Sequence, residues 1–191
     1  MAGNRRNRGD RRDAIVDAAL ELFAERGYRG ATLAAIAQRA GLTQQGLLHY
    51  FPSKEKLLVE VLRLRDERDV EALSHGTDSV SLDGLATLVD LNAQRRGMVQ
   101  SYTVLSADSV TEEHPAREYF QDRYRRFRRR LAATIRAEHG DALPEGLDAD
   151  RAAALVIAMM DGLQLQWLLS DEELDMPGLF RTFLGLLGRQ G

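Results

Sequence analysis

Residues 32–54 read TLAAIAQRAGLTQQGLLHYFPSK, and this stretch contains two short helical patterns separated by a tight turn. Thr32 and Thr43 precede the two patterns, and a threonine hydroxyl there can accept a hydrogen bond from a backbone N–H of the first turn. Gly41 lies between the patterns, where a glycine can end one helix and let the chain turn into the next. The segment therefore predicts a helix-turn-helix.

The second of these helices is predicted to present polar groups to the outside. Its apolar residues fall on the inward face, which leaves six outward positions: Thr43, Gln44, Gln45, Gly46, His49 and Tyr50. A glutamine amide can pair with adenine in the major groove of DNA, and a threonine can contact a thymine methyl group or a phosphate. Lys54 and Thr32 are placed to contact the DNA backbone. These eight residues are the predicted DNA-binding set.

The charge distribution points to the same kind of partner. Residues 1–56 contain ten Lys or Arg and six Asp or Glu, a net charge of +4, whereas the other 135 residues contain 16 and 23, a net of −7. A basic N-terminal third on an acidic body is typical of a protein that binds nucleic acid through one end.

The residues around this motif agree in type and spacing with a known family. The agreement covers Phe23, Gly27-Tyr28, Thr32, Ile36-Ala37, Ala40-Gly41-Leu42-Thr43, Tyr50-Phe51, Pro52-Ser53-Lys54 and Leu57. Residues 11–62 thus resemble the DNA-binding domain of TetR-family repressors. Two positions depart from the pattern: many members carry a small residue where Gln45 stands and a tyrosine where Leu48 stands.

The resemblance implies an all-helical homodimer that binds a palindromic operator on double-stranded DNA, most simply as a repressor released by a small-molecule effector. An activator or a protein-interaction regulator of the same fold is the alternative. A helical small-molecule-binding protein or enzyme is an alternative of another class.

Helical periodicity runs through nearly the whole chain and predicts about nine helices, an all-α fold. We expect a flexible basic tail at 1–10 and a three-helix DNA-binding domain at 11–56. Residues 57–191 are expected to form a C-terminal ligand-binding and dimerisation domain, which a helix at 53–73 links to the first.

Two further sets of residues follow from the resemblance and the helical pattern. The expected dimer interface consists of apolar residues on the last two helices: Val156, Met160, Leu163, Trp167, Phe180, Phe183, Leu184 and Leu187. The expected lining of a ligand pocket is aromatic, Met and polar: Met98, Tyr102, Leu105, Tyr119, Tyr124, Met159, Gln164 and Trp167. Such residues at helical spacing are more often core than ligand site.

A group of arginines at 123–130 allows two interpretations. The simpler one is a solvated helix face around a buried stripe. The other is that one arginine faces inward and binds an anionic ligand.

Several classes of function lack their signatures in this chain. It has no cysteine, its four histidines lack metal-ligand spacing, and no nucleotide-binding or hydrolase motif occurs. We therefore expect no metal, no cofactor and no enzymatic activity. The longest purely apolar run is nine residues, 152–160, far short of a membrane span, so a cytoplasmic protein without a membrane partner is expected.

Overall fold

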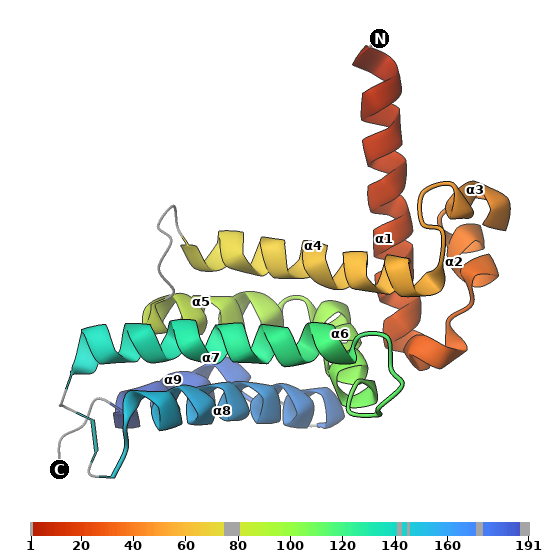
Figure 1. Ribbon diagram of the computed structural model, residues 1–191. Coiled ribbons are helices and arrows are strands. Elements are labelled where there is room, and N and C mark those ends of the chain that lie inside the picture. The colour runs from red at the N-terminus through yellow and green to blue at the C-terminus, as the bar shows by residue number, and fades with distance from the viewer. Residues whose placement is uncertain (1, 75–80, 141–142, 145, 171–173, 188–191) are drawn as a thin grey trace. The chain divides into compact units, whose positions relative to one another are not determined.

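The computed structural model describes residues 2–74, 81–140, 143–144, 146–170 and 174–187, and the regular structure in these ranges is entirely helical (Figure 1). The predicted all-α fold is confirmed. The helices are α1 (Ala2–Gly30), α2 (Leu33–Arg39), α3 (Gln44–Leu48), α4 (Lys54–Ser74), α5 (Leu82–Ala93), α6 (Arg96–Asp108), α7 (Arg117–His139), α8 (Ala149–Leu169) and α9 (Met176–Leu187).

The chain divides into two compact units, and the division differs from the expected one. The first unit contains Met1–Glu67 and Gln100–Phe120, and the second contains Arg68–Val99 and Gln121–Gly191. Most of α6 and the start of α7 therefore belong with the helix-turn-helix. Long-range hydrogen bonds explain this, because the Ser101 hydroxyl donates to the carbonyl of Leu20 and Tyr119 Oη donates to the carbonyl of Leu62 at 2.9 Å.

Helix α1 supplies the centre of the first unit's core. The buried residues Ile15, Ala19, Leu22 and Phe23 recur at helical spacing along α1. The core of the unit also contains buried residues of the next three helices: Ile36 of α2, Leu47 of α3, and Leu57 and Leu58 of α4. The helix begins at Ala2, so residues 2–10 lie in α1.

The second unit is a bundle formed by α5, α7, α8 and α9. Its core includes Leu85 and Val89 of α5, Leu131 and Ile135 of α7, and from α8 and α9 a larger group: Ala152, Ala153, Val156, Met160, Leu163, Met176 and Phe180. Helix α8 is long and apolar enough to cross a membrane by length and composition. One face of it lies in this core, as expected for the central helix of a folded unit.

Candidate DNA-binding site

The two helices of the motif start at the capping residues that the sequence predicts. Thr32 Oγ1 accepts a hydrogen bond from the backbone N–H of Ala35 at 3.2 Å, and Thr43 Oγ1 accepts one from Gly46 at 3.0 Å. Each hydroxyl satisfies a donor that a helix terminus otherwise leaves without a partner. Both threonines are exposed, so the start of each helix is open to a large ligand.

The turn between α2 and α3 is fixed by the backbone. Gly41 has a φ of 69°, a conformation that glycine adopts without steric cost, and the Leu42 N–H donates to the carbonyl of Ala37 at 2.8 Å. Ile36, Ala37 and Leu47 are buried beneath the turn. The motif is therefore a rigid element that positions the outer face of α3.

The structure brings the predicted base-contacting residues together on α3 and at its two ends. Thr43, Gln44, Gln45 and His49 are exposed, whereas Gly46 and Tyr50 are half-buried. Gln44 begins the helix, and His49 directly follows its last residue, Leu48. Exposed amides on a short, rigid helix can form hydrogen bonds to base edges without rearrangement of the core.

Lys54, the predicted backbone contact, begins α4 and is held by a neighbouring aromatic ring. Its Nζ lies 4.3 Å from the ring centroid of Tyr28 and 3.4 Å from the carbonyl oxygen of Arg29. Partial burial lowers the pKa of Lys54, and the carboxylate of Glu55 opposes this effect. The Tyr28 hydroxyl donates to Glu55 Oε1 at 3.1 Å, and burial followed by this bond raises the pKa of Tyr28.

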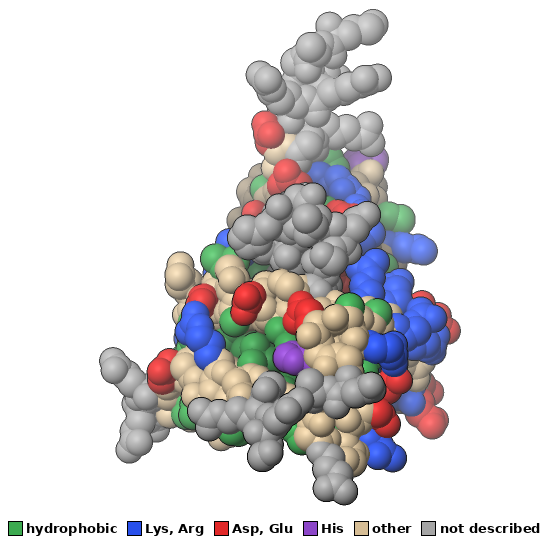
Figure 2. All heavy atoms as spheres, turned by 90° about the vertical axis from the view of Figure 1, so that its left-hand side faces the viewer, with side chains coloured by type: hydrophobic (Ala, Val, Ile, Leu, Met, Phe, Trp, Pro, Cys, Tyr) green, Lys and Arg blue, Asp and Glu red, His purple; other side chains and the backbone are tan. Residues whose placement is uncertain are grey.

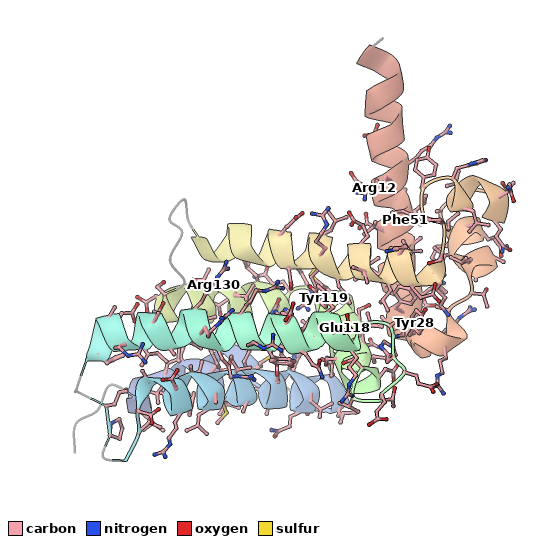
Figure 3. The ribbon with its side chains drawn as sticks, viewed as in Figure 1. Arg12, Tyr28, Phe51, Glu118, Tyr119 and Arg130 are labelled. Atoms are coloured by element: carbon pink, nitrogen blue, oxygen red, sulfur yellow. The ribbon has the colours of Figure 1, made fainter. Side chains whose placement is uncertain are left out.

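Ion pairs join α1 to the other helices of the motif, and sequence analysis missed them. Arg39 of α2 donates two hydrogen bonds to the Glu25 carboxylate, at 2.6 and 3.0 Å, which lowers the pKa of Glu25. Arg12 donates to Glu60 of α4 at 2.6 Å. Its guanidinium lies 5.3 Å from the ring centroid of Phe51, and both Arg12 and Phe51 are labelled in Figure 3. Hydrogen bonds from Arg63 and then Arg12 lower the pKa of Glu60.

The residues expected to line a ligand pocket are divided between the two units. In the first unit, Tyr102 and Leu105 are buried, with the Arg65 guanidinium 3.7 Å from the ring centroid of Tyr102, and Tyr119 bonds to α4. The other five lie in the second unit: Met98, Tyr124, Met159, Gln164 and Trp167. Gln164 is 3% exposed, so it is the most deeply buried polar group of this set.

The structure changes the residues available for a dimer interface. Five of the expected ones are buried in the core of the second unit: Val156, Met160, Leu163, Phe180 and Leu187. Trp167, Phe183 and Leu184 are half-buried against the same core. Large apolar residues are instead exposed on other faces of the two helices: Leu155, Leu165 and Leu169 of α8 and Leu179 and Leu186 of α9.

The arginines of α7 favour the simpler interpretation. Arg125, Arg126, Arg128, Arg129 and Arg130 are exposed, and Lys and Arg side chains gather on the right of the face in Figure 2. The half-buried Arg123 has its guanidinium 5.7 Å from the ring centroid of Phe127 on the same helix. This part of α7 is therefore a solvated face.

A capped helix-turn-helix with an outward polar face defines the class of the protein as a DNA-binding transcriptional regulator. Residues 15–61 match the model described as bacterial regulatory proteins, tetR family, and residues 84–187 match the C-terminal domain of BetI-type transcriptional repressors. The chain belongs to the TetR family of transcriptional regulators.

Relatives and solved structures of this family align over most of the chain. The regulator BetI of Paraburkholderia xenovorans is 31% identical over 90% of this chain and 89% of its own length. The regulator TtgR of Pseudomonas putida is 29% identical over 87% of this chain and 84% of its own length. A transcriptional regulator from Saccharomonospora viridis, solved in complex with choline, has a TM-score of 0.73 and 26% identity and covers 93% of this chain and 96% of its own. A TetR-family regulator from Agrobacterium tumefaciens has a TM-score of 0.77 and 18% identity and covers 95% of this chain and 99% of its own.

Proposed function

We propose that this protein is a transcriptional repressor that binds a palindromic operator as a homodimer and is released by a small molecule. The observation that carries the proposal is the exposed face of α3, where Gln44, Gln45 and His49 stand on a capped helix. The match of residues 84–187 to BetI-type repressors supports the sign of regulation. A regulator of this kind acts on DNA in the cytoplasm and needs no catalysis.

The proposed second copy covers the exposed apolar face of α8 and α9. Small residues lie on this side of α8, because Ala158 is exposed and a Cβ built on Gly162 meets no atom within 4 Å. Small side chains let two helix backbones approach closely, and the surrounding leucines can then pack across the contact. Two-fold symmetry of such a dimer would map onto a palindromic operator, with half-sites about one helical turn apart.

The proposed effector is a small organic cation, with choline as the first compound to test. The support comes from the BetI-type match and from the choline in a regulator that shares 26% of its residues with this chain. A ligand that binds only the native protein raises its melting temperature by mass action. Choline should therefore raise the melting temperature of the full-length protein and release it from its operator.

Footprinting on the promoter region of its own gene tests DNA recognition. Gln44→Ala with Gln45→Ala should abolish specific protection, because each lost amide–base pair costs about 1–3 kcal/mol. The matched control is Gln94→Ala with Gln121→Ala, which removes two exposed glutamines outside the motif and should leave the footprint intact. Full protection by the Gln44/Gln45 variant would contradict the assignment of α3.

A further inference from the structure

We propose that Tyr28 is a positioning residue for DNA binding, which holds the ammonium group of Lys54 ready to contact a backbone phosphate. The inference rests on the proposed phosphate contact of Lys54. It goes further because it assigns a role in DNA affinity to Tyr28, which is itself buried and is not one of the proposed contact residues. Tyr28 and Lys54 both belong to the first unit.

The contact between the two residues orders a normally flexible side chain. Lys54 Nζ lies 4.3 Å from the ring centroid of Tyr28, within the range of a cation–π interaction, and 3.4 Å from the Arg29 carbonyl oxygen. An ammonium has three protons, so these contacts leave donor capacity for a phosphate. A free lysine side chain loses rotamer entropy when it is fixed, and a side chain already ordered loses less of it on binding.

Tyr28 can hold Lys54 because its own ring is fixed on several sides. It is 8% exposed, and its hydroxyl donates to Glu55 Oε1 at 3.1 Å. The ring centroid lies 5.9 Å from that of Phe23 and 5.0 Å from that of His114, the latter in a T-shaped contact. The backbone of Gly27, with a φ of 66° and a ψ of 175°, turns the chain just before it.

The chain has few lysines, so the contact of Lys54 with Tyr28 can be studied without interference from other lysine side chains. The sequence has two lysines, Lys54 and Lys56, and therefore 26 − 2 = 24 arginines. Lys56 is exposed, whereas Lys54 is half-buried. Lys56 is thus a matched control on the same turn of α4.

Salt dependence separates a positioning role from a merely structural one. Each phosphate contact by a cation contributes about 0.9 to the slope of log Kobs against log salt concentration on duplex DNA. A residue that only stabilises the fold changes the melting temperature but leaves this slope unchanged. A residue that places Lys54 at the phosphate changes the slope as well.

The experiment measures that slope for the full-length protein on a mixed-sequence DNA duplex. Lys54→Gln should lower the magnitude of the slope by about 0.9 per subunit, which is about 1.8 for the proposed homodimer. Tyr28→Leu should lower the magnitude of the slope by most of the same amount, both in the wild-type protein and in the Lys56→Gln variant. In the Lys54→Gln variant, the addition of Tyr28→Leu should change the slope no further. Tyr28→Phe keeps the ring and should retain the slope.

The outcomes distinguish the inference from the function on which it rests. If Lys54→Gln lowers the slope and Tyr28→Leu does not, the positioning role is wrong and the phosphate contact stands. If Lys54→Gln leaves the slope unchanged, both are overturned. Should Tyr28→Leu fail to fold, NMR of the wild type still decides: the Cε protons of Lys54 should lie upfield of those of Lys56 through the ring current of Tyr28, and coincident shifts would overturn the inference.

Discussion

The hydroxyl oxygen of Thr43 accepts a hydrogen bond from the backbone N–H of Gly46 at 3.0 Å, and this contact fixes the first turn of the short helix α3. A helix of this length has little stability of its own, so its cap and its packing decide whether it forms. The orientation of Gln44 and Gln45 therefore depends on Thr43.

Thr43→Ala should lower the free energy of unfolding by about 1 kcal/mol, because the cap is lost, and should weaken operator binding further by loosening α3. Thr43→Ser keeps a hydroxyl and should therefore retain most of the stability and most of the operator affinity. Urea unfolding and fluorescence anisotropy measure the two effects. Thr182→Ala, at an exposed threonine whose hydroxyl donates to the Gly178 carbonyl, is the control, and an equal loss there would argue against a special role of the cap.

Gly27→Ala should destabilise the protein by about 1–3 kcal/mol, because the backbone at φ 66° and ψ 175° lies in a region that is essentially restricted to glycine. The new Cβ would also lie 3.3 Å from Asp108 Oδ2. Gly97→Ala is the control, since a Cβ there meets no atom within 4 Å and φ is not positive. It should be neutral or slightly stabilising in the same thermal unfolding experiment.

Leu165→Glu should convert the proposed dimer to a monomer, because a carboxylate would be buried without a partner in the centre of an apolar contact. Light scattering should then report a fall from about 42.8 kDa, twice 21.4 kDa, to 21.4 kDa. Val110→Glu changes a residue that is 73% exposed in the first unit and should leave the mass unchanged. A Leu165→Glu protein that keeps the dimer mass would place the interface elsewhere.

The stability of the protein should fall as the pH drops below about 6.5, in part because of His114. Burial lowers the pKa of His114; Asp108 opposes this effect and Arg29 adds to it. The unfolded chain therefore binds more protons than the folded protein between the two pKa values, and the free energy of unfolding decreases as pH falls through this window. Above the unfolded pKa the imidazole is neutral in both states and the effect vanishes.

His114→Asn tests this prediction by removing the titrating group. An asparagine oxygen can still accept the hydrogen bond that the Ala116 N–H donates to Nδ1 at 3.2 Å. The variant should show a weaker loss of stability below about pH 6.5 in urea unfolding. An identical pH dependence in both proteins would assign it to other groups.

Sequence patterns were sufficient for the helices and insufficient for the contacts between them. Thr32, Gly41 and Thr43 mark helix ends by local chemistry, and local chemistry can be recognised in a sequence. The contact of Tyr28 with Lys54 joins residues that are 54 − 28 = 26 positions apart in the sequence. Hydrophobic periodicity shows which face of a helix is apolar, but it does not show which other helix packs against that face.

The same limit applies to the proposed dimer surface. Helix α8 carries apolar residues on two opposite faces, with Val156 and Met160 on one and Leu155 and Leu165 on the other. Hydrophobicity alone ranks these faces equally, and only the packing of α8 in the second unit shows which one is covered. The burial of Gln164 likewise could not be read from its residue type.

The composition of the first unit has a consequence for the order of events on the ribosome. Residues 1–67 emerge before residues 100–120, which complete the same unit through Ser101 and Tyr119. The 120 − 67 = 53 residues from 68 to 120 need about 3–11 s at a synthesis rate of about 5–20 residues per second. During this interval the nascent helix-turn-helix lacks α6 and the start of α7. The first unit can then be completed while residues 121–191, the larger part of the second unit, have still to be synthesised.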